Sequence, residues 1–226
     1  MRSALVVGAT PQGAGVNIGP LPNLRGAIAA IPVPAPTITA TGSGNGSVAV
    51  SWNAVPGVNG YDIFRKGAHT SAWNLVGSTG NTQFTDSALT PGKTYLYRVQ
   101  AYDRQGNRSP DSNYELATSI DYTDPQLTTS TIIRARHIID VRTAVNAICT
   151  YAGAGICPSL PFSGSSLDET QLQTQTIQAS AFTGVQNQIV SLRAAIGASA
   201  ATFRETPAAG TTIKIIHMEN LRAGAN

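Results

Sequence analysis

The chain of 226 residues is long enough for one or two domains, and 42% of its residues are hydrophobic, enough to build a core. Only 12% are charged, against about a quarter in a typical soluble protein, and this composition favours an extracellular surface. The net charge of +3 is small and the basic residues are scattered, so no stripe for nucleic acid is expected. No apolar run approaches the roughly 18 residues that a membrane span needs.

Residues 1–34 form the least regular part of the sequence. Two short apolar runs lie there among Gly, Pro and Asn, and they contain Leu5, Val6, Val7, Ile28 and Ile31. Such a segment cannot fold alone, yet it is more apolar than an ordinary solvated linker. Two interpretations stay open: a flexible linker, or an extended N-terminal arm that adds a strand to the sheet edge of a neighbouring subunit.

Short strand patterns and turn signals alternate after this segment. Strands are expected at residues 47–52, 60–65, 73–76, 83–86, 95–101 and 114–117. Residues rich in Gly, Asn and Pro form turns between them, for example at 42–46 and 56–60. Several strands at regular spacing are typical of an antiparallel β-sandwich.

The turn Leu89-Thr90-Pro91-Gly92 and the strand that begins at Tyr95 suggest a tyrosine corner, in which the phenol bonds to upstream backbone. At these residues the chain resembles a fibronectin type III domain, over about Ala35–Ser119. The resemblance implies a β-sandwich at 35–120 that holds and spaces other modules. Its expected structural core includes Trp52, Tyr61, Leu89, Tyr95, Tyr97 and Val99.

Helical spacing replaces the strand pattern beyond an expected linker at 121–130, so a small all-α domain is expected at 131–226. The fold class is therefore multi-domain, β followed by α, with an extended N-terminal arm. Apolar stripes predict an interface between the helices, formed by Ile138, Val141, Val145, Phe182, Val185, Ile189, Met218 and Leu221.

The helical stripes align with one another as an internal repeat. The segments 133–142 and 213–222 match best, and they resemble a helical repeat that recurs near the C-termini of large bacterial surface or secreted proteins. This resemblance implies location more than activity. The middle copy has Ala181 where the others have His137 and His217, which weakens any argument for a site built on the histidines.

Cys149 and Cys157 enclose a short loop that contains Gly. A disulfide is favoured, and it would fit an oxidising compartment. Free thiols stay open as an alternative. A metal or redox role is less favoured, because two thiols without further ligands fall short of a zinc set.

The sequence shows no catalytic motif. His137 and His217 are expected to cap or pack near helix starts rather than bind a metal or act as bases, and His69 falls in a loop. No nucleophile is paired with a His and an acid, and no Walker or dinucleotide pattern occurs. The chain is therefore expected to be non-enzymatic, with no cofactor and no metal.

Three functions are weighed. The favoured one is an extracellular or cell-surface structural or adhesive subunit, which self-associates through its arm and helical repeats or binds another extracellular protein. The alternative is a polysaccharide-binding accessory module of a secreted hydrolase, in which Trp73, Tyr102 and Tyr122 could stack on sugar rings. The least favoured is a self-contained enzyme. Neither a nucleic acid nor a membrane span is expected.

Overall fold

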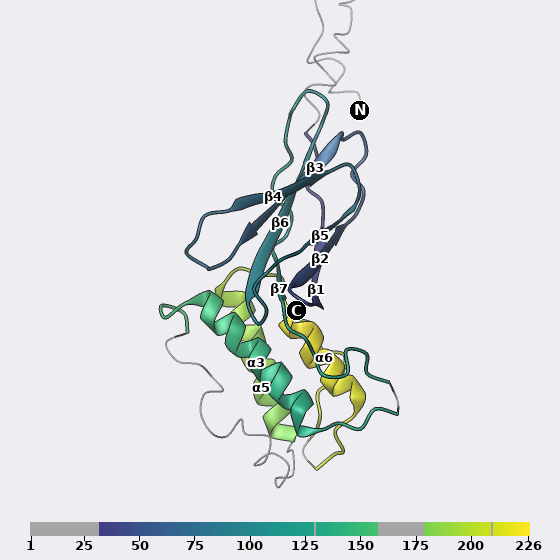
Figure 1. The fold of residues 1–226 in the computed structure, drawn as a ribbon, viewed down its shortest axis with the longest axis vertical. Helices are drawn as coiled ribbons and strands as arrows, with labels where there is room; N and C mark the ends of the chain where they lie inside the picture. Colours follow the sequence, from purple (N-terminus) through teal and green to yellow (C-terminus); the bar gives the residue numbers. More distant parts are fainter. Residues whose placement is uncertain (1–31, 129, 158–178, 209) are drawn as a thin grey trace, which may run out of the picture.

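The computed structural model describes residues 32–128, 130–157, 179–208 and 210–226. A β-sandwich lies above a bundle of three helices (Figure 1). The first described residues enter at the end of the sandwich far from the helices, and the C-terminal residue lies at the junction of the two parts. The predicted arm residues Leu5, Val6, Val7, Ile28 and Ile31 lie outside the described residues.

Two antiparallel sheets form the sandwich. The first has the order β1 (Ile38–Gly44), β2 (Ser47–Trp52) and β5 (Gln83–Asp86). The second has the order β4 (Asn74–Thr79), β3 (Gly60–Lys66), β6 (Thr94–Tyr102) and β7 (Glu115–Thr118).

Strand β1 is missing from the strands that the sequence predicts, which assigns residues 42–46 to a turn. The strand instead continues to Gly44, with Gly42 paired to Val48 of β2. Ile38 and Ala40 are its only buried hydrophobic residues, so its alternation is too short to stand out in the sequence. The predicted boundary at residue 35 leaves Val33 out of the sandwich. In the structure Val33 is buried and packs with the other side chains of the sandwich core.

The sandwich core contains the six residues predicted for it. Trp52, Tyr61, Leu89, Tyr95, Tyr97 and Val99 are all at most 7% exposed. At the tyrosine corner, the Thr90 N–H donates to the Tyr95 hydroxyl over 3.1 Å. The Tyr61 hydroxyl likewise accepts from the Val55 N–H at 2.9 Å, so buried phenols fasten both loops to the core.

The helices are α3 (Ala135–Ala152), α5 (Ala179–Ala195) and α6 (Ile215–Ala225). Each packs against the other two, and their buried stripes contain the predicted Ile138, Val141, Val145, Phe182, Val185, Ile189, Met218 and Leu221. The C-terminal end of each helix meets the sandwich (Figure 1). The carbonyl of Tyr151 in α3 accepts from the His69 N–H, and the carbonyl of Ala225 in α6 accepts from the Thr118 hydroxyl.

A hydrophobic core between the helices extends to the outer face of the sandwich. Leu96 of β6 and Leu116 of β7 face away from the sandwich interior, yet they are only 2% and 0% exposed because the helices cover them. Ile120, just beyond β7, joins the same core. The sequence shows these residues as strand positions but does not indicate what covers them.

A disulfide joins Cys149, in the last turn of α3, to Cys157, with their Cα atoms 5.5 Å apart. Gly153 ends the helix between them with a φ of 81°, in the left-handed region that favours glycine. The bridge therefore ties the end of α3 to the loop that leaves it. None of the described helices combines the length and the apolar character needed to cross a bilayer.

Candidate binding site at the junction of sandwich and helices

The two repeated histidines begin their helices in the same way. The Nδ1 atom of His137 accepts from the Arg134 N–H at 3.1 Å, and that of His217 accepts from the Lys214 N–H at 3.0 Å. Each His thereby satisfies a backbone donor that the first helical turn leaves free. Both rings are at most 1% exposed, so the histidines are placed to cap helices rather than to reach a substrate.

The distal nitrogens of these histidines differ in their partners. Nε2 of His137 lies 3.0 Å from an oxygen of Asp124, whereas Nε2 of His217 lies 3.5 Å from Glu205 and makes no hydrogen bond to any described residue. Among the described residues, no three His, Cys, Asp or Glu side chains gather into a group that could hold a metal ion. The region around the histidines therefore offers helix caps and a loop attachment.

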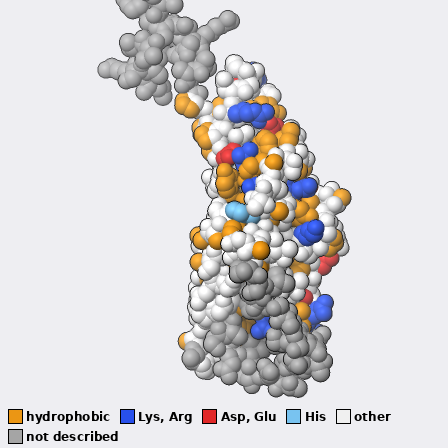
Figure 2. All heavy atoms as spheres, turned by 90° about the vertical axis from the view of Figure 1, so that its left-hand side faces the viewer, with side chains coloured by type: hydrophobic (Ala, Val, Ile, Leu, Met, Phe, Trp, Pro, Cys, Tyr) orange, Lys and Arg blue, Asp and Glu red, His pale blue; other side chains and the backbone are white. Residues whose placement is uncertain are grey.

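The three aromatic residues expected to stack on sugars each carry a basic side chain on the ring. The Arg98 guanidinium lies 4.7 Å from the Trp73 ring, with Lys66 at 5.3 Å from the same ring. Arg108 lies 5.9 Å from the Tyr102 ring. Figure 2 shows hydrophobic and basic side chains intermingled on one face of the molecule. These rings stabilise cations of the chain itself and are poor open platforms for a sugar.

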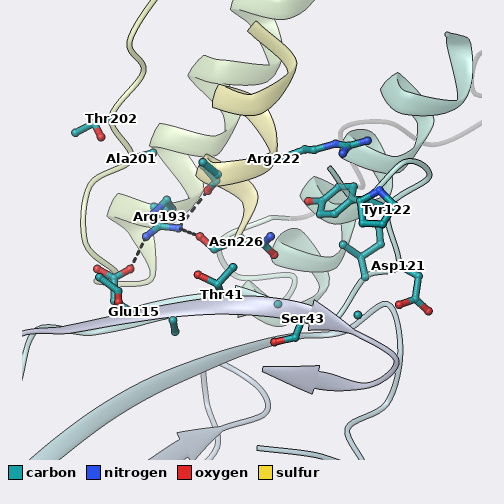
Figure 3. Close-up of a pocket in the computed structure, with 18 of the residues that line it drawn as sticks. Thr41, Ser43, Glu115, Asp121, Tyr122, Arg193, Ala201, Thr202, Arg222 and Asn226 are labelled. Atoms are coloured by element: carbon teal, nitrogen blue, oxygen red, sulfur yellow. Dashed lines mark hydrogen bonds and ion pairs between the residues drawn. The ribbon is translucent and has the colours of Figure 1, made fainter. Parts of the chain in front are cut away.

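A cleft of about 820 Å³ opens where the sandwich meets the helices (Figure 3). The outer side of β1 forms one wall, and the end of α6 with residues 200–202 forms the other. The segment after β7 closes one end. Its polar lining consists of Thr39, Thr41, Ser43, Asn45, Glu115, Asp121, Tyr122, Arg193, Thr202, Arg222 and Asn226. This volume lies within the range of about 300–1,000 Å³ that is usual for ligand pockets.

Arg193 of α5 joins β7, the end of α6 and residue Ser199 beside the cleft. Its Nη2 donates to a carboxylate oxygen of Glu115 in β7 at 2.8 Å. Its Nη1 donates to the carbonyls of Gly224 and Asn226, and its Nε donates to the carbonyl of Ser199. Burial lowers the pKa of Arg193, and Glu115 opposes this shift by attracting the charged form. The guanidinium therefore acts as a clamp between the sandwich and the helices.

Arg222 of α6 holds the segment that the sequence predicts as a linker. Its two terminal nitrogens donate to the carbonyls of Thr123 and Asp124, both at 2.7 Å, and its guanidinium lies 4.7 Å from the Tyr122 ring. On the other side, the Asn45 N–H donates to Asp121. The segment is therefore bound to both the helices and the sandwich. Burial raises the pKa of Tyr122 well above its ordinary value, so its phenol is a neutral group.

Several polar atoms at the cleft have no hydrogen-bond partner among the described residues. They are the Tyr122 hydroxyl, the Asn226 side-chain oxygen and Nε of Arg222, and all three are buried. Figure 3 places Asn226 between Arg193 and Tyr122, above Thr41. A buried polar group without a partner costs about 1–3 kcal/mol, so such groups usually bind ordered water or a ligand.

Sequence reasoning names two of these cleft residues, Tyr122 as a ring that could stack on sugars and Arg222 as a position of the repeat, and neither as part of a cleft. The Arg193–Glu115 pair joins residues far apart in the sequence, and no local pattern indicates that they meet. The one signal available was the low number of charged residues, which makes a buried Arg on an apolar stripe conspicuous.

Comparison with known proteins identifies the sandwich. Residues 33–116 match the family model described as "Fibronectin type III domain". An "Alpha-amylase" of Niallia circulans is 42% identical over 76 residues, which cover 32% of this chain and 5% of that enzyme. A "Poly(3-hydroxybutyrate) depolymerase" of Ralstonia pickettii is 40% identical over 73 residues, covering 32% and 14%.

Two further proteins are similar to part of the chain. "Exoglucanase B" of Cellulomonas fimi is 39% identical over 71 residues, covering 29% of this chain and 6% of that enzyme. A solved Fn3-like protein from Clostridium thermocellum is 26% identical with a TM-score of 0.36, covering 42% of this chain and 98% of that one. The chain thus spans only 5 to 14% of the length of these three enzymes. Residues 33–116 are therefore similar to fibronectin type III domains.

Proposed function

We propose that the chain is a non-catalytic accessory module of a secreted, polymer-degrading protein and that it contacts a polysaccharide. The observation that carries this proposal is the similarity of its sandwich to segments of enzymes named for the polymers they degrade. The disulfide between Cys149 and Cys157 supports a location outside the reducing cytosol. A module of this kind would hold and orient a polymer near a catalytic domain carried elsewhere.

The joining of the two parts supports a rigid module. Leu96 and Leu116 extend the helical core into the sandwich, and the Arg193–Glu115 pair fastens the junction. The matching helix starts at His137 and His217 also support a repeated helical unit. Such a unit would give the sandwich a second surface, with the cleft between the two.

The test is adsorption to insoluble polysaccharide. The full chain is mixed with microcrystalline cellulose, chitin or starch granules, and the protein left in solution is measured over a range of concentrations. The proposal predicts saturable depletion by at least one of these polymers and no release of reducing sugar. Depletion no greater than that of serum albumin on all three polymers would overturn the proposed contact. Release of reducing sugar would overturn the non-catalytic assignment.

Self-association through the N-terminal arm and helical repeats stays a prediction from sequence. The arm residues lie outside the described part of the chain, but the position of Val33 sets where a deletion of the arm should end. Val33 packs in the sandwich core, so a deletion should end at residue 31. Sedimentation of the full chain and of this deletion should show loss of self-association only in the latter. A full chain that is monomeric at high concentration would contradict the prediction.

A further inference from the structure

We infer that the cleft between β1 and the end of α6 binds a neutral, polyhydroxylated ligand, a short stretch of a polysaccharide chain. This inference rests on the proposed function and names the site of its polymer contact. It depends on three properties of the cleft. The terminal nitrogens of its two arginines are already bonded within the chain, large apolar side chains are nearly absent, and several hydroxyl and amide groups have no partner among the described residues.

The basic groups of the cleft do not favour an anionic ligand. The guanidinium of Arg193 donates hydrogen bonds to Glu115 and to three backbone carbonyls. Both terminal nitrogens of Arg222 donate to the carbonyls of Thr123 and Asp124. Because the lining also includes the carboxylates of Glu115 and Asp121, two positive charges face two negative ones. A phosphate or carboxylate ligand would find neither an available bidentate fork nor a net positive field.

The apolar part of the lining does not favour a hydrophobic peptide or a lipid. Ile120 is the only large aliphatic side chain among the described residues that line the cleft, and it is buried in the helical core. The other apolar lining residues are small, namely Ala40, Pro125, Ala200, Ala201 and Ala223. Grooves that bind amphipathic helices present large apolar pockets at helical spacing, which this lining lacks.

What the cleft offers is hydroxyl groups. Thr41, Ser43 and Thr202 are exposed, and their hydroxyls make no hydrogen bond within the described part of the chain. Each can donate one hydrogen bond and accept two, as sugar hydroxyls can. The unpartnered Tyr122 hydroxyl and Asn226 oxygen lie deeper, where they could bind an ordered water that bridges to the ligand.

The approach of Asp121 to β1 closes one end of the cleft and depends on glycine. Gly44 has a φ of 76°, and a Cβ atom there would lie 2.6 Å from an Asp121 carboxylate oxygen. That oxygen accepts from the Asn45 N–H, and the other carboxylate oxygen has no partner among the described residues. Asp121 is exposed, so its second oxygen can accept from a sugar hydroxyl, a charge-assisted and therefore strong contact.

The test compares two tryptophan substitutions in one row of the same sheet. Thr41 of β1 is paired with Ala49 of β2, which is paired in turn with Thr85 of β5. Thr41 and Thr85 are both exposed, but only Thr41 lines the cleft. Thr41→Trp should therefore fill the cleft, whereas Thr85→Trp should add the same ring to the same sheet without entering it. Asp121→Asn serves as a smaller change that removes one charged acceptor.

Binding of cellohexaose and chitohexaose to the full chain is measured by titration calorimetry, with thermal melting as a check on folding. We expect Thr41→Trp to raise the dissociation constant for the hexasaccharides at least about tenfold, and Asp121→Asn to raise it about tenfold. Thr85→Trp should raise it by less than about twofold. If Thr41→Trp fails to fold, the comparison between Asp121→Asn and Thr85→Trp decides.

The outcomes separate this inference from the proposed function. A parent chain that binds neither the hexasaccharides nor the insoluble polymers overturns both. A parent chain that binds, with Thr41→Trp and Asp121→Asn binding equally well, leaves the proposed function standing and overturns the cleft. Equal losses for Thr41→Trp and Thr85→Trp would place the ligand on the open sheet face and overturn the cleft as well.

Discussion

The sandwich and the helical unit both enclose buried cores, but they are stabilised differently. The sandwich core consists of its own residues, from Val33 to Ala117, closed by strand alternation and a tyrosine corner. The helical core includes Leu96, Leu116 and Ile120 from outside the helices and depends on a disulfide and a buried ion pair as well. The sandwich core is therefore closed by its own residues, whereas the helices need the surface that the sandwich presents.

Loss of the sandwich core should have the largest effect. Trp52 packs 5.3 Å from the Tyr61 ring and is 7% exposed. Trp52→Ala should lower the free energy of unfolding by about 3–5 kcal/mol, because it removes a large buried side chain and leaves a cavity. Since the helices pack against β6 and β7, they should unfold in the same transition as the sandwich. Far-ultraviolet circular dichroism at 222 nm should report this loss of helix. Helical signal that persists after the sandwich has unfolded would break the comparison.

The ion pair at the junction should come next. Arg193→Met leaves the largely buried Glu115 carboxylate without its charged partner and should cost about 3 kcal/mol. Hydrogen exchange should quicken in α5 and α6 while β2 and β3 keep their protection. The double variant Arg193→Met with Glu115→Leu should recover part of the loss, because no unpaired charge remains. Equal quickening in both parts would show that the sandwich is not self-sufficient.

Reduction of the disulfide should have a smaller effect, confined to the helices. Opening the short loop between Cys149 and Cys157 should lower the free energy of unfolding by about 2–3 kcal/mol, as the denatured chain regains freedom. Calorimetric scans with and without reductant should show a lower Tm for the helical part, with Cys149→Ser plus Cys157→Ser as the matched variant. Two alkylatable thiols in non-reduced protein would show that Cys149 and Cys157 do not form a disulfide.

The smallest effect should distinguish the two histidine caps. His137→Ala and His217→Ala remove the same ring and the same bond to a backbone N–H. Only His137 also bonds to Asp124, so His137→Ala should cost about 1 kcal/mol more than His217→Ala in urea titrations. The variant Asp124→Ala should abolish the difference. Equal costs in the parent background would mean that the Asp124 bond contributes nothing.

Local patterns predict the sandwich well because its information is local. Val48, Val50 and Trp52 alternate along one strand, and the turn before Tyr95 carries its own Pro and Gly signals. Strand β1 escapes prediction since only Ile38 and Ala40 carry its alternation before glycines begin. The helical stripes are equally visible, because each follows the helix period.

The candidate site could not be predicted in the same way. Glu115 and Arg193 meet across 78 positions of sequence, and Arg222 reaches Thr123 across 99. Neither contact follows from periodicity, because both depend on where the helices dock. The aromatic residues were visible in the sequence, but the cations on the Trp73 and Tyr122 rings were not. The cleft is a product of docking, which single-sequence patterns do not encode.

The most direct test of the account is to map where a saccharide touches the full chain. Backbone amide signals are followed by nuclear magnetic resonance as cellohexaose or chitohexaose is added. If the saccharide binds in the cleft, the largest shifts should fall at the lining residues Thr41, Ser43, Asp121 and Thr202, and Thr85 across the sheet should stay unchanged. Shifts centred on Thr85 or on the face around Trp73 would contradict binding in the cleft. The lack of any shift at a saturating saccharide concentration would contradict it as well.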